Sequence, residues 1–315
     1  MNFGRFKSSS EKWIVVSDSV IGASHLRHQN IPNQDAFKNY SNSLGRPVTI
    51  AAVADGHGSS LHFRSDKGSP YACETLVSKF KQVVRVLDHA DDSSFYSSAV
   101  LEQLPRSIQE SWRENVLEHY NEHPFNPDIY RLLQGSLVEV LHNPVIAYGS
   151  TLLGAVVTQT YFIFVQIGDG NILAVSRNGT VKQVFQEDED IIVANSTHSL
   201  CSDDMLDYFK VSIFKRGSND PVLISLSTDG YRNSFKTIEG FMKTGSDYLK
   251  LLREEGPEVV QSELAGFLRK ASDEGCGDDT TLALMYCMSG KEKNSHSSLL
   301  NKMKRTITRN RNDSG

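Results

Sequence analysis

The feature that most constrains the fold of this chain is an apolar segment that ends in an acidic turn. Residues 48–54 predict a buried strand, and Asp55-Gly56-His57-Gly58 follows it directly. A strand end fixes the carboxylate of Asp55, while Gly56 lets the backbone approach whatever that carboxylate binds. His57 titrates near neutrality and could carry a proton. Taken alone, the turn could equally be structural, because Asp-Gly turns after strands are common.

Four more acidic turns share this design, at Asn33-Gln34-Asp35, Gly168-Asp169-Gly170, Thr228-Asp229-Gly230 and Gly277-Asp278-Asp279. Carboxylate ligands without paired Cys or His favour a hard divalent cation, Mg²⁺ or Mn²⁺. Converging carboxylates repel one another unless a cation neutralises them. Two ions held ~3.5–4 Å apart can activate a bridging water and polarise a phosphoryl oxygen. Any one of these turns could be a simple Asp-Gly turn or a helix cap, but five in one domain favour a shared metal site.

Composition indicates a soluble globular protein, with 39% hydrophobic and 23% charged residues in a chain of 315. The sequence contains no run of the ~20 apolar residues that a membrane span needs. The first residues lack the apolar core of a signal peptide, so a cytoplasmic location is expected. The four cysteines have no CxxC spacing, which argues against a zinc site or a disulfide framework.

Charge divides the chain unevenly. Residues 291–315 carry a net charge of +5, which leaves −10 on residues 1–290 because the whole chain is −5. An acidic body argues against nucleic acid as the main partner, although the tail alone could contact RNA or an anionic membrane. We therefore expect a flexible N-terminus at 1–10, one catalytic domain at 11–290 and a basic, disordered tail at 291–315.

Hydrophobic periodicity predicts more strands than helices, and many of the strands are joined by short hairpins. This texture favours an α+β fold with antiparallel sheets flanked by helices over alternating βαβ units. Strands are predicted at 13–20, 48–54, 151–158, 161–167, 171–176, 180–185, 211–214, 222–227 and 281–287, and helices around 72–87, 101–116, 129–141 and 258–271.

These motifs, in this order over about residues 13–288, resemble the type 2C metal-dependent Ser/Thr protein phosphatases. The resemblance implies a four-layer α/β/β/α sandwich with two central antiparallel sheets. The region 59–71 is similar to the bacterial branch of that family. The matching segments are Asn33-Gln34-Asp35-Ala36, Val53-Ala54-Asp55-Gly56-His57-Gly58, Tyr148-Gly149-Ser150-Thr151, Gln166-Ile167-Gly168-Asp169-Gly170, Leu226-Ser227-Thr228-Asp229-Gly230 and Asp278-Asp279-Thr280-Thr281.

The same resemblance implies a role for each site residue. Asp55 would bridge two core ions and the Gly56 carbonyl would bind one of them. Asp229 and Asp278 would complete the first ion, and Asp169 with Asp229 would form a weaker third site. Asp278 is preferred to Asp279 because the family's ligand is the first acid of that motif. His57 would protonate the leaving oxygen, although hydrogen bonding within its turn is the alternative.

Two positions depart from the family pattern. Gln34 stands where many members have Glu, so the second ion would be held more loosely, or through water by Asp35, which would also serve the catalytic step. The family places an Arg a few residues earlier to hold the substrate phosphate. The candidates here are Arg27, His25 and His28; Arg27 leads because an Arg fork suits phosphate best.

The resemblance therefore predicts an Mg²⁺- or Mn²⁺-dependent phosphatase that hydrolyses phospho-Ser/Thr through direct attack by a metal-bridging hydroxide. Its partners would be phosphorylated proteins, supplied by a Ser/Thr kinase pathway. Two alternatives stay open at this point: a weakly active relative that binds phosphoproteins as a regulatory module, and a phosphatase for small phosphate esters.

Overall fold

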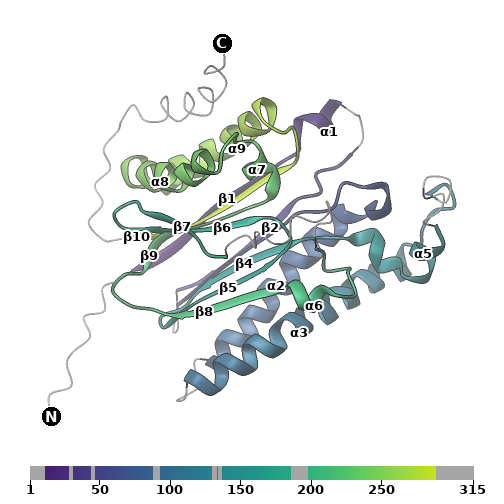
Figure 1. Ribbon diagram of the computed structural model, residues 1–315, viewed down its shortest axis with the longest axis horizontal. Helices are drawn as coiled ribbons and strands as arrows, with labels where there is room; N and C mark the ends of the chain where they lie inside the picture. The colour runs from purple at the N-terminus through teal and green to yellow at the C-terminus, as the bar shows by residue number, and fades with distance from the viewer. Residues whose placement is uncertain are drawn as a thin grey trace.

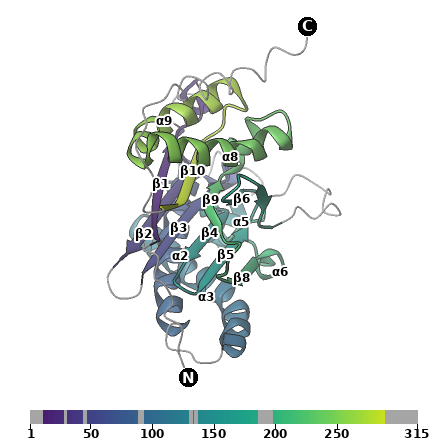
Figure 2. The ribbon, with the colours of Figure 1, turned by 90° about the vertical axis from the view of Figure 1, so that its left-hand side faces the viewer.

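The computed structural model describes residues 11–27, 31–43, 47–87, 93–129, 133, 137–185 and 198–288. Two five-stranded antiparallel sheets pack face to face between helical layers (Figures 1 and 2). The first sheet has the order β1 (Lys12–Val20), β10 (Thr280–Met288), β9 (Pro221–Ser227), β6 (Asn171–Ser176) and β7 (Val181–Gln183). The second has the order β2 (Ala36–Asn42), β3 (Val48–Ala54), β4 (Leu152–Val157), β5 (Tyr161–Ile167) and β8 (Lys210–Lys215).

Each sheet carries a pair of long helices on its outer face, which confirms the predicted four-layer α+β sandwich. Figure 1 shows α8 and α9 over the first sheet and α2 and α3 over the second. The bounds of these helices are α2 (Ser65–Leu87), α3 (Ser93–Glu122), α8 (Ile238–Glu255) and α9 (Pro257–Glu274). Shorter elements are α1 (Ala23–Arg27), η1 (Ser60–His62), α5 (Leu137–His142), η3 (Pro144–Tyr148), α6 (Met205–Tyr208) and α7 (Asp229–Asn233).

The burial of strand β3 on both faces explains why its sequence, except for Thr49, is apolar. Ile50 and Ala52 face the α2–α3 layer, whereas Ala51 and Val53 belong to the core between the sheets. All four are 0% exposed. A strand buried on both faces has no solvent side, so its side chains do not alternate between apolar and polar.

Besides the short helices, the structure adds two longer elements that periodicity did not predict. Strand β2 is half-exposed along most of its length, so its apolar alternation is weak. Helix α8 contains Gly240 and Gly245, which lower helix propensity. A side chain at Gly245 would stand 3.0 Å from Val175 Cγ2 of β6, so this glycine lets the helix approach the sheet.

Within the described part of the chain, each helix is too short or too polar to cross a membrane. The predicted N-terminal segment 1–10 and basic tail 291–315 lie outside the described residues, so those boundaries stay predictions.

The packing of α3 on α2 leads to a first prediction. Trp112 of α3 is fully buried, and its Nε1 donates a hydrogen bond of 3.0 Å to the Gly68 carbonyl of α2. Trp112→Ala should lower the free energy of unfolding by about 3–5 kcal/mol through cavity formation. Leu117→Ala, at a 37% exposed position on the same helix, should cost less than about 1 kcal/mol. Urea unfolding measures both values, and equal losses would contradict the assigned core face.

Candidate active site

Strand register gathers the acidic turns at one end of the sandwich. Ala36 of β2 pairs with Ala54 of β3, so Asp35 and Asp55 flank the same end of that ladder. In the other sheet, Ser227 of β9 pairs with both Leu282 of β10 and Asn171 of β6. The turns after β9, before β10 and before β6 therefore meet. These turns carry Asp229, Asp278 and Asp169.

A pocket of about 580 Å³ opens where these turns meet. Four of the predicted carboxylates line it, and among the described lining residues the only basic side chains are histidines, with no Lys or Arg. The pocket is therefore strongly acidic. Its titratable side chains are Asp55, Asp169, Asp229, Asp278, His25, His57, His62, Cys201 and Cys276.

The carboxylates interact electrostatically although their turns are far apart in sequence. Burial raises the pKa of Asp55 well above its ordinary value, and the nearby charges of Asp35, Asp229 and Asp169 raise it further. The pKa of Asp35 is also raised, first by burial and then by Asp279, against hydrogen bonds that lower it. Without a cation, the cluster thus resists full ionisation, as converging carboxylates must.

The Gly-Ser-Thr segment predicted from sequence holds the Asp55 turn in place. The Asp55 amide donates to Thr151 Oγ1 at 2.9 Å, and the Thr151 amide donates to the Asp55 carbonyl at 2.8 Å. Gly56 forms an isolated bridge with Ser150. A Cβ at Gly56 would lie 2.7 Å from the Gln34 carbonyl oxygen, so only glycine fits this crossing of chains.

The buried oxygen atoms at this end of the sandwich that have no hydrogen-bond partner include Gln34 Oε1 and Asp35 Oδ1. The other atoms of these groups are occupied. Gln34 Nε2 donates to Ser65 Oγ at 2.7 Å, and Asp35 Oδ2 accepts from Thr228 Oγ1 at 2.8 Å. Unpaired buried acceptors are costly, and a divalent cation would satisfy them. The donor set fits the hard cation that the sequence predicts.

His57 lines the pocket beside a second histidine that the sequence analysis missed. The ring centroids of His57 and His62 are 4.8 Å apart, and His62 Nδ1 is 2.5 Å from the Ile146 carbonyl oxygen. Burial, with a contribution from His62, lowers the pKa of His57 to about 4. His57 is therefore neutral near pH 7. A single histidine at the end of a short 3₁₀ turn gives no sequence signal of this pairing.

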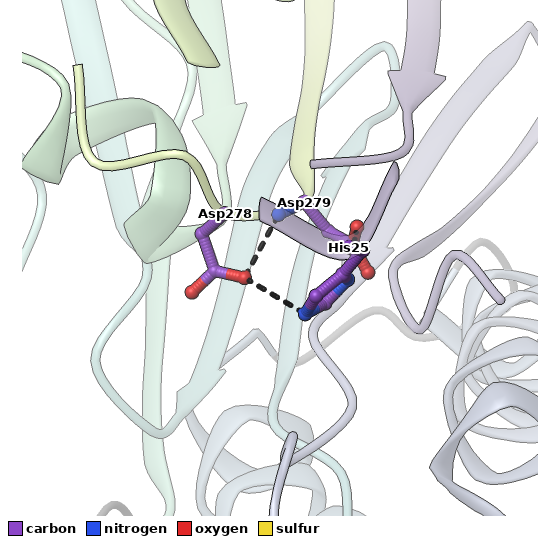
Figure 3. A group of neighbouring side chains, drawn as sticks. All are labelled: His25, Asp278 and Asp279. Carbon is purple, nitrogen blue, oxygen red and sulfur yellow. Dashed lines mark hydrogen bonds and ion pairs between the residues drawn. The ribbon is translucent and has the colours of Figure 1, made fainter. Parts of the chain in front are cut away.

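The structure separates the two leading candidates for phosphate binding. His25 lines the pocket, whereas Arg27 is exposed near the end of α1 and is absent from the pocket lining. His28, the third, lies outside the described residues. Figure 3 shows that His25 points toward Asp278 and Asp279. Asp279, to which the sequence analysis gave no role, is 4% exposed and bonds to His25 Nδ1 at 2.8 Å.

A larger groove of about 1580 Å³ lies at the opposite end of the strands. Its position follows from the turns that line it, β2–β3, β4–β5, β6–β7 and β8–β9. Arg216 there is engaged by Glu11 at 2.7 Å and by Asp220 at 3.2 Å. The groove lacks the acidic turns, so the smaller pocket is the candidate active site.

Comparison with known proteins identifies the family. The model of the family described as Protein phosphatase 2C matches residues 21–269, which is more than half of the chain. The chain belongs to the protein phosphatase 2C family. A search of curated protein sequences finds no match.

Solved structures show the same protein phosphatase 2C fold at low sequence identity. The Staphylococcus aureus serine/threonine phosphatase Stp1 has a TM-score of 0.52 at 15% identity, over 90% of this chain and 99% of its own. The catalytic domain of the phosphatase PstP, in complex with two manganese ions, has a TM-score of 0.51 at 15% identity, over 88% and 98%. A C. elegans sex-determining protein has a TM-score of 0.52 at 17% identity, over 93% and 67%.

The raised pKa values lead to a prediction on stability. Because the folded-state pKa of Asp55 exceeds its unfolded value, the folded protein binds more protons than the unfolded chain between those two pKa values. Without metal, the stability contribution of this carboxyl is therefore present at low pH and lost as the pH rises through the folded-state pKa. Asp55→Asn should match the wild type near pH ~4 and be more stable than it at neutral pH. Urea unfolding in EDTA measures the difference.

With saturating Mn²⁺ at neutral pH, the wild type should instead be more stable than Asp55→Asn. A ligand at 100 times its Kd stabilises the folded state by about 2.7 kcal/mol, and Asp55→Asn should lose most of this gain. A wild type whose unfolding does not respond to Mn²⁺ would argue against a metal centre at Asp55.

Gln34 provides a separate test of the same cluster. Gln34→Glu places a negative charge where Oε1 now lies unpaired, so it should lower the Mn²⁺ concentration needed for half-saturation. The metal-free protein should be destabilised, because the new carboxylate joins others that already repel. Ser65→Ala is the matched control, since it removes the Gln34 Nε2 partner and adds no charge. Unchanged Mn²⁺ binding in calorimetric titration of Gln34→Glu would place this side chain outside the metal centre.

Proposed function

We propose that this protein is an Mg²⁺- or Mn²⁺-dependent phosphoprotein phosphatase that hydrolyses phospho-Ser/Thr. The observation that carries the proposal is the charge of the pocket: four carboxylates line it, with histidines as the only described basic side chains. A phosphate dianion would be repelled from such a pocket unless cations neutralised it first. A metal-dependent enzyme for an anionic substrate explains why the described pocket lining combines four carboxylates with no Lys or Arg.

The residues that would hold the ions come from different turns. Asp55 interacts electrostatically with Asp35, Asp229 and Asp169, so it would be the ligand shared by the ions, with the Gly56 carbonyl beside it. Asp229 and Asp278 would complete the coordination of one ion, and Asp169 with Asp229 would form a weaker third site. The pKa of Asp278 is raised by burial and by the charge of Asp229, as expected for two ligands of one ion. When bound, the ions supply an activated water and withdraw charge from the phosphoryl oxygens.

The chain's own groups handle the protons. Asp35, which is not among the residues that line the pocket, is held by Thr228 through Oδ2, and its unpaired Oδ1 would accept a hydrogen bond from the attacking water. His57 would deliver a proton to the departing serine or threonine oxygen. Because burial lowers the pKa of His57 to about 4, this role depends on the bound phosphate, whose negative charge favours the protonated imidazole.

Support for the substrate class comes from the family, which is described as Protein phosphatase 2C. Similar structures are titled serine phosphatase and serine/threonine phosphatase. The substrates would thus be phosphorylated proteins, and a Ser/Thr kinase must act before this enzyme to supply them.

The proposal predicts metal-dependent turnover of phospho-Ser/Thr peptides. Release of inorganic phosphate should require Mn²⁺ or Mg²⁺ and should exceed release from a phospho-Tyr peptide and from a small aryl phosphate. Asp55→Asn should abolish it. His57→Gln should reduce kcat by about 10²–10⁴-fold, the usual contribution of a general acid, and should retain Mn²⁺ binding.

The alternatives predict other outcomes. A phosphoprotein-binding module would bind the phosphopeptide in the presence of Mn²⁺ and release no phosphate. An enzyme for small esters would turn over the aryl phosphate faster than any phosphopeptide. If His57→Gln turns over the peptide at the wild-type rate, the leaving group takes its proton from another source.

A further inference from the structure

The Asp279 carboxylate, at the edge of the pocket, makes more hydrogen bonds than the proposed function requires. The carboxylate of Asp279 accepts hydrogen bonds from three donors: the Gly22 amide at 2.6 Å, the Gln34 amide at 2.7 Å and His25 Nδ1 at 2.8 Å. Both of its oxygens are thereby used inside the protein, and its side chain is 4% exposed. Asp279 therefore orients its neighbours and is not itself available to an ion.

Helix α1, which carries His25, is hydrogen-bonded to the turn that precedes Asp278 and to helix α9. The Ser24 amide donates to the Gly277 carbonyl at 2.8 Å, and the Ala23 amide donates to Ser272 Oγ at 3.0 Å. A Cβ at Gly22 would lie 2.5 Å from the Asp278 carbonyl carbon, so the chain could not approach this closely with any other residue. His25 is thus fixed twice: the backbone of its helix is anchored, and its imidazole ring is hydrogen-bonded through Nδ1.

This arrangement leaves one ring nitrogen for an external partner. With Nδ1 bonded to Asp279, Nε2 of His25 faces Asp278 Oδ1 at 3.9 Å, as Figure 3 shows. That separation is too long for a hydrogen bond. Two ligands that each lie ~2.1 Å from one ion can be up to ~4.2 Å apart, so the spacing suits a shared cation.

A second, independent observation points to the same pocket. Gln34 is 7% exposed, lines the pocket and leaves Oε1 without a partner, while its own amide is held by Asp279. Asp279 thus fixes the imidazole of His25 and the backbone of Gln34, whose side-chain oxygen is unpaired. A carboxylate behind an imidazole, with the second nitrogen on a metal, is the usual support of a histidine ligand.

We infer that His25 is a nitrogen ligand, through Nε2, of the ion held by Asp278, with Asp279 as its positioning residue. The inference rests on the proposed function and deepens it. An imidazole ligand favours divalent transition-metal ions over Mg²⁺. The site is therefore a mixed nitrogen–oxygen site selective for a transition ion, and His25 is not the phosphate contact that the family pattern would suggest. A neutral imidazole whose Nδ1–H faces Asp279 carries a lone pair at Nε2 and has no proton to donate to a phosphate oxygen.

The test is pulsed electron paramagnetic resonance of Mn²⁺ bound to the full chain. The wild type should show coupling of the electron spin to ¹⁴N, and growth with ¹⁵N-histidine should change that coupling to ¹⁵N. His25→Gln should abolish the coupling and weaken Mn²⁺ binding by about 10–100-fold, with a smaller effect on Mg²⁺. His62→Gln is the matched control, because it removes another pocket histidine and should keep the coupling.

Each other outcome overturns the inference in a distinct way. Mn²⁺ that binds in an Asp55-dependent manner without nitrogen coupling would refute the His25 ligand and leave the proposed function standing. Coupling that survives in His25→Gln would assign the nitrogen to another residue. If His25→Gln weakens inhibition by inorganic phosphate and leaves Mn²⁺ binding intact, His25 contacts phosphate instead. Failure of both Mn²⁺ and Mg²⁺ to bind would refute the proposed function itself. The labelled wild type needs no substitution, so a variant that fails to fold does not remove the test.

Discussion

Mutual repulsion among closely spaced carboxylates is the constraint on which this structure depends. The pKa of Asp55 is raised by burial and by three neighbouring aspartates, so the folded chain holds negative charges together at a cost. The cost is offset by two large hydrophobic cores. One fills the space between the two sheets and the space under α8 and α9, and the other lies between the second sheet and α2–α3. A cation reverses the sign of the interaction, because the same carboxylates then become its ligands. Stability and metal binding are therefore coupled at this end of the sandwich.

The polar groups around the carboxylates fix them in a geometry they would not adopt alone. Thr151 and Asp55 exchange hydrogen bonds across adjacent strands, and Thr228 links Asp35 to the other sheet. Both threonines sit at strand ends within the sandwich, so the sheet packing determines their positions. The acidic cluster is pre-organised in this sense: its members are held by a rigid scaffold before any ion arrives.

The departures from the family pattern concern charge. Gln34 removes one negative charge from the cluster, whereas Asp279 adds a second carboxylate next to Asp278. In the structure the added carboxylate is buried and bonded to the Gln34 amide and to His25, so the two changes lie in one connected network. The exposed position of Arg27 leaves the described pocket with histidines as its only basic side chains. Anion binding there depends on bound cations more than it would beside an arginine.

The sequence by itself determined the elements and the candidate carboxylates. Apolar runs located β3 and β5 at their observed bounds, because strands buried on both faces carry few polar residues. It missed β2 and α8, where exposure and glycines weaken the local pattern. Motif order predicted that Asp55, Asp229 and Asp278 belong together, and register brings them to one pocket. Only the tertiary structure revealed the His57–His62 pair and the hold of Asp279 on His25, since these contacts join segments with no common periodicity. Local sequence encodes burial and turns; which turns meet is decided by how two sheets pack.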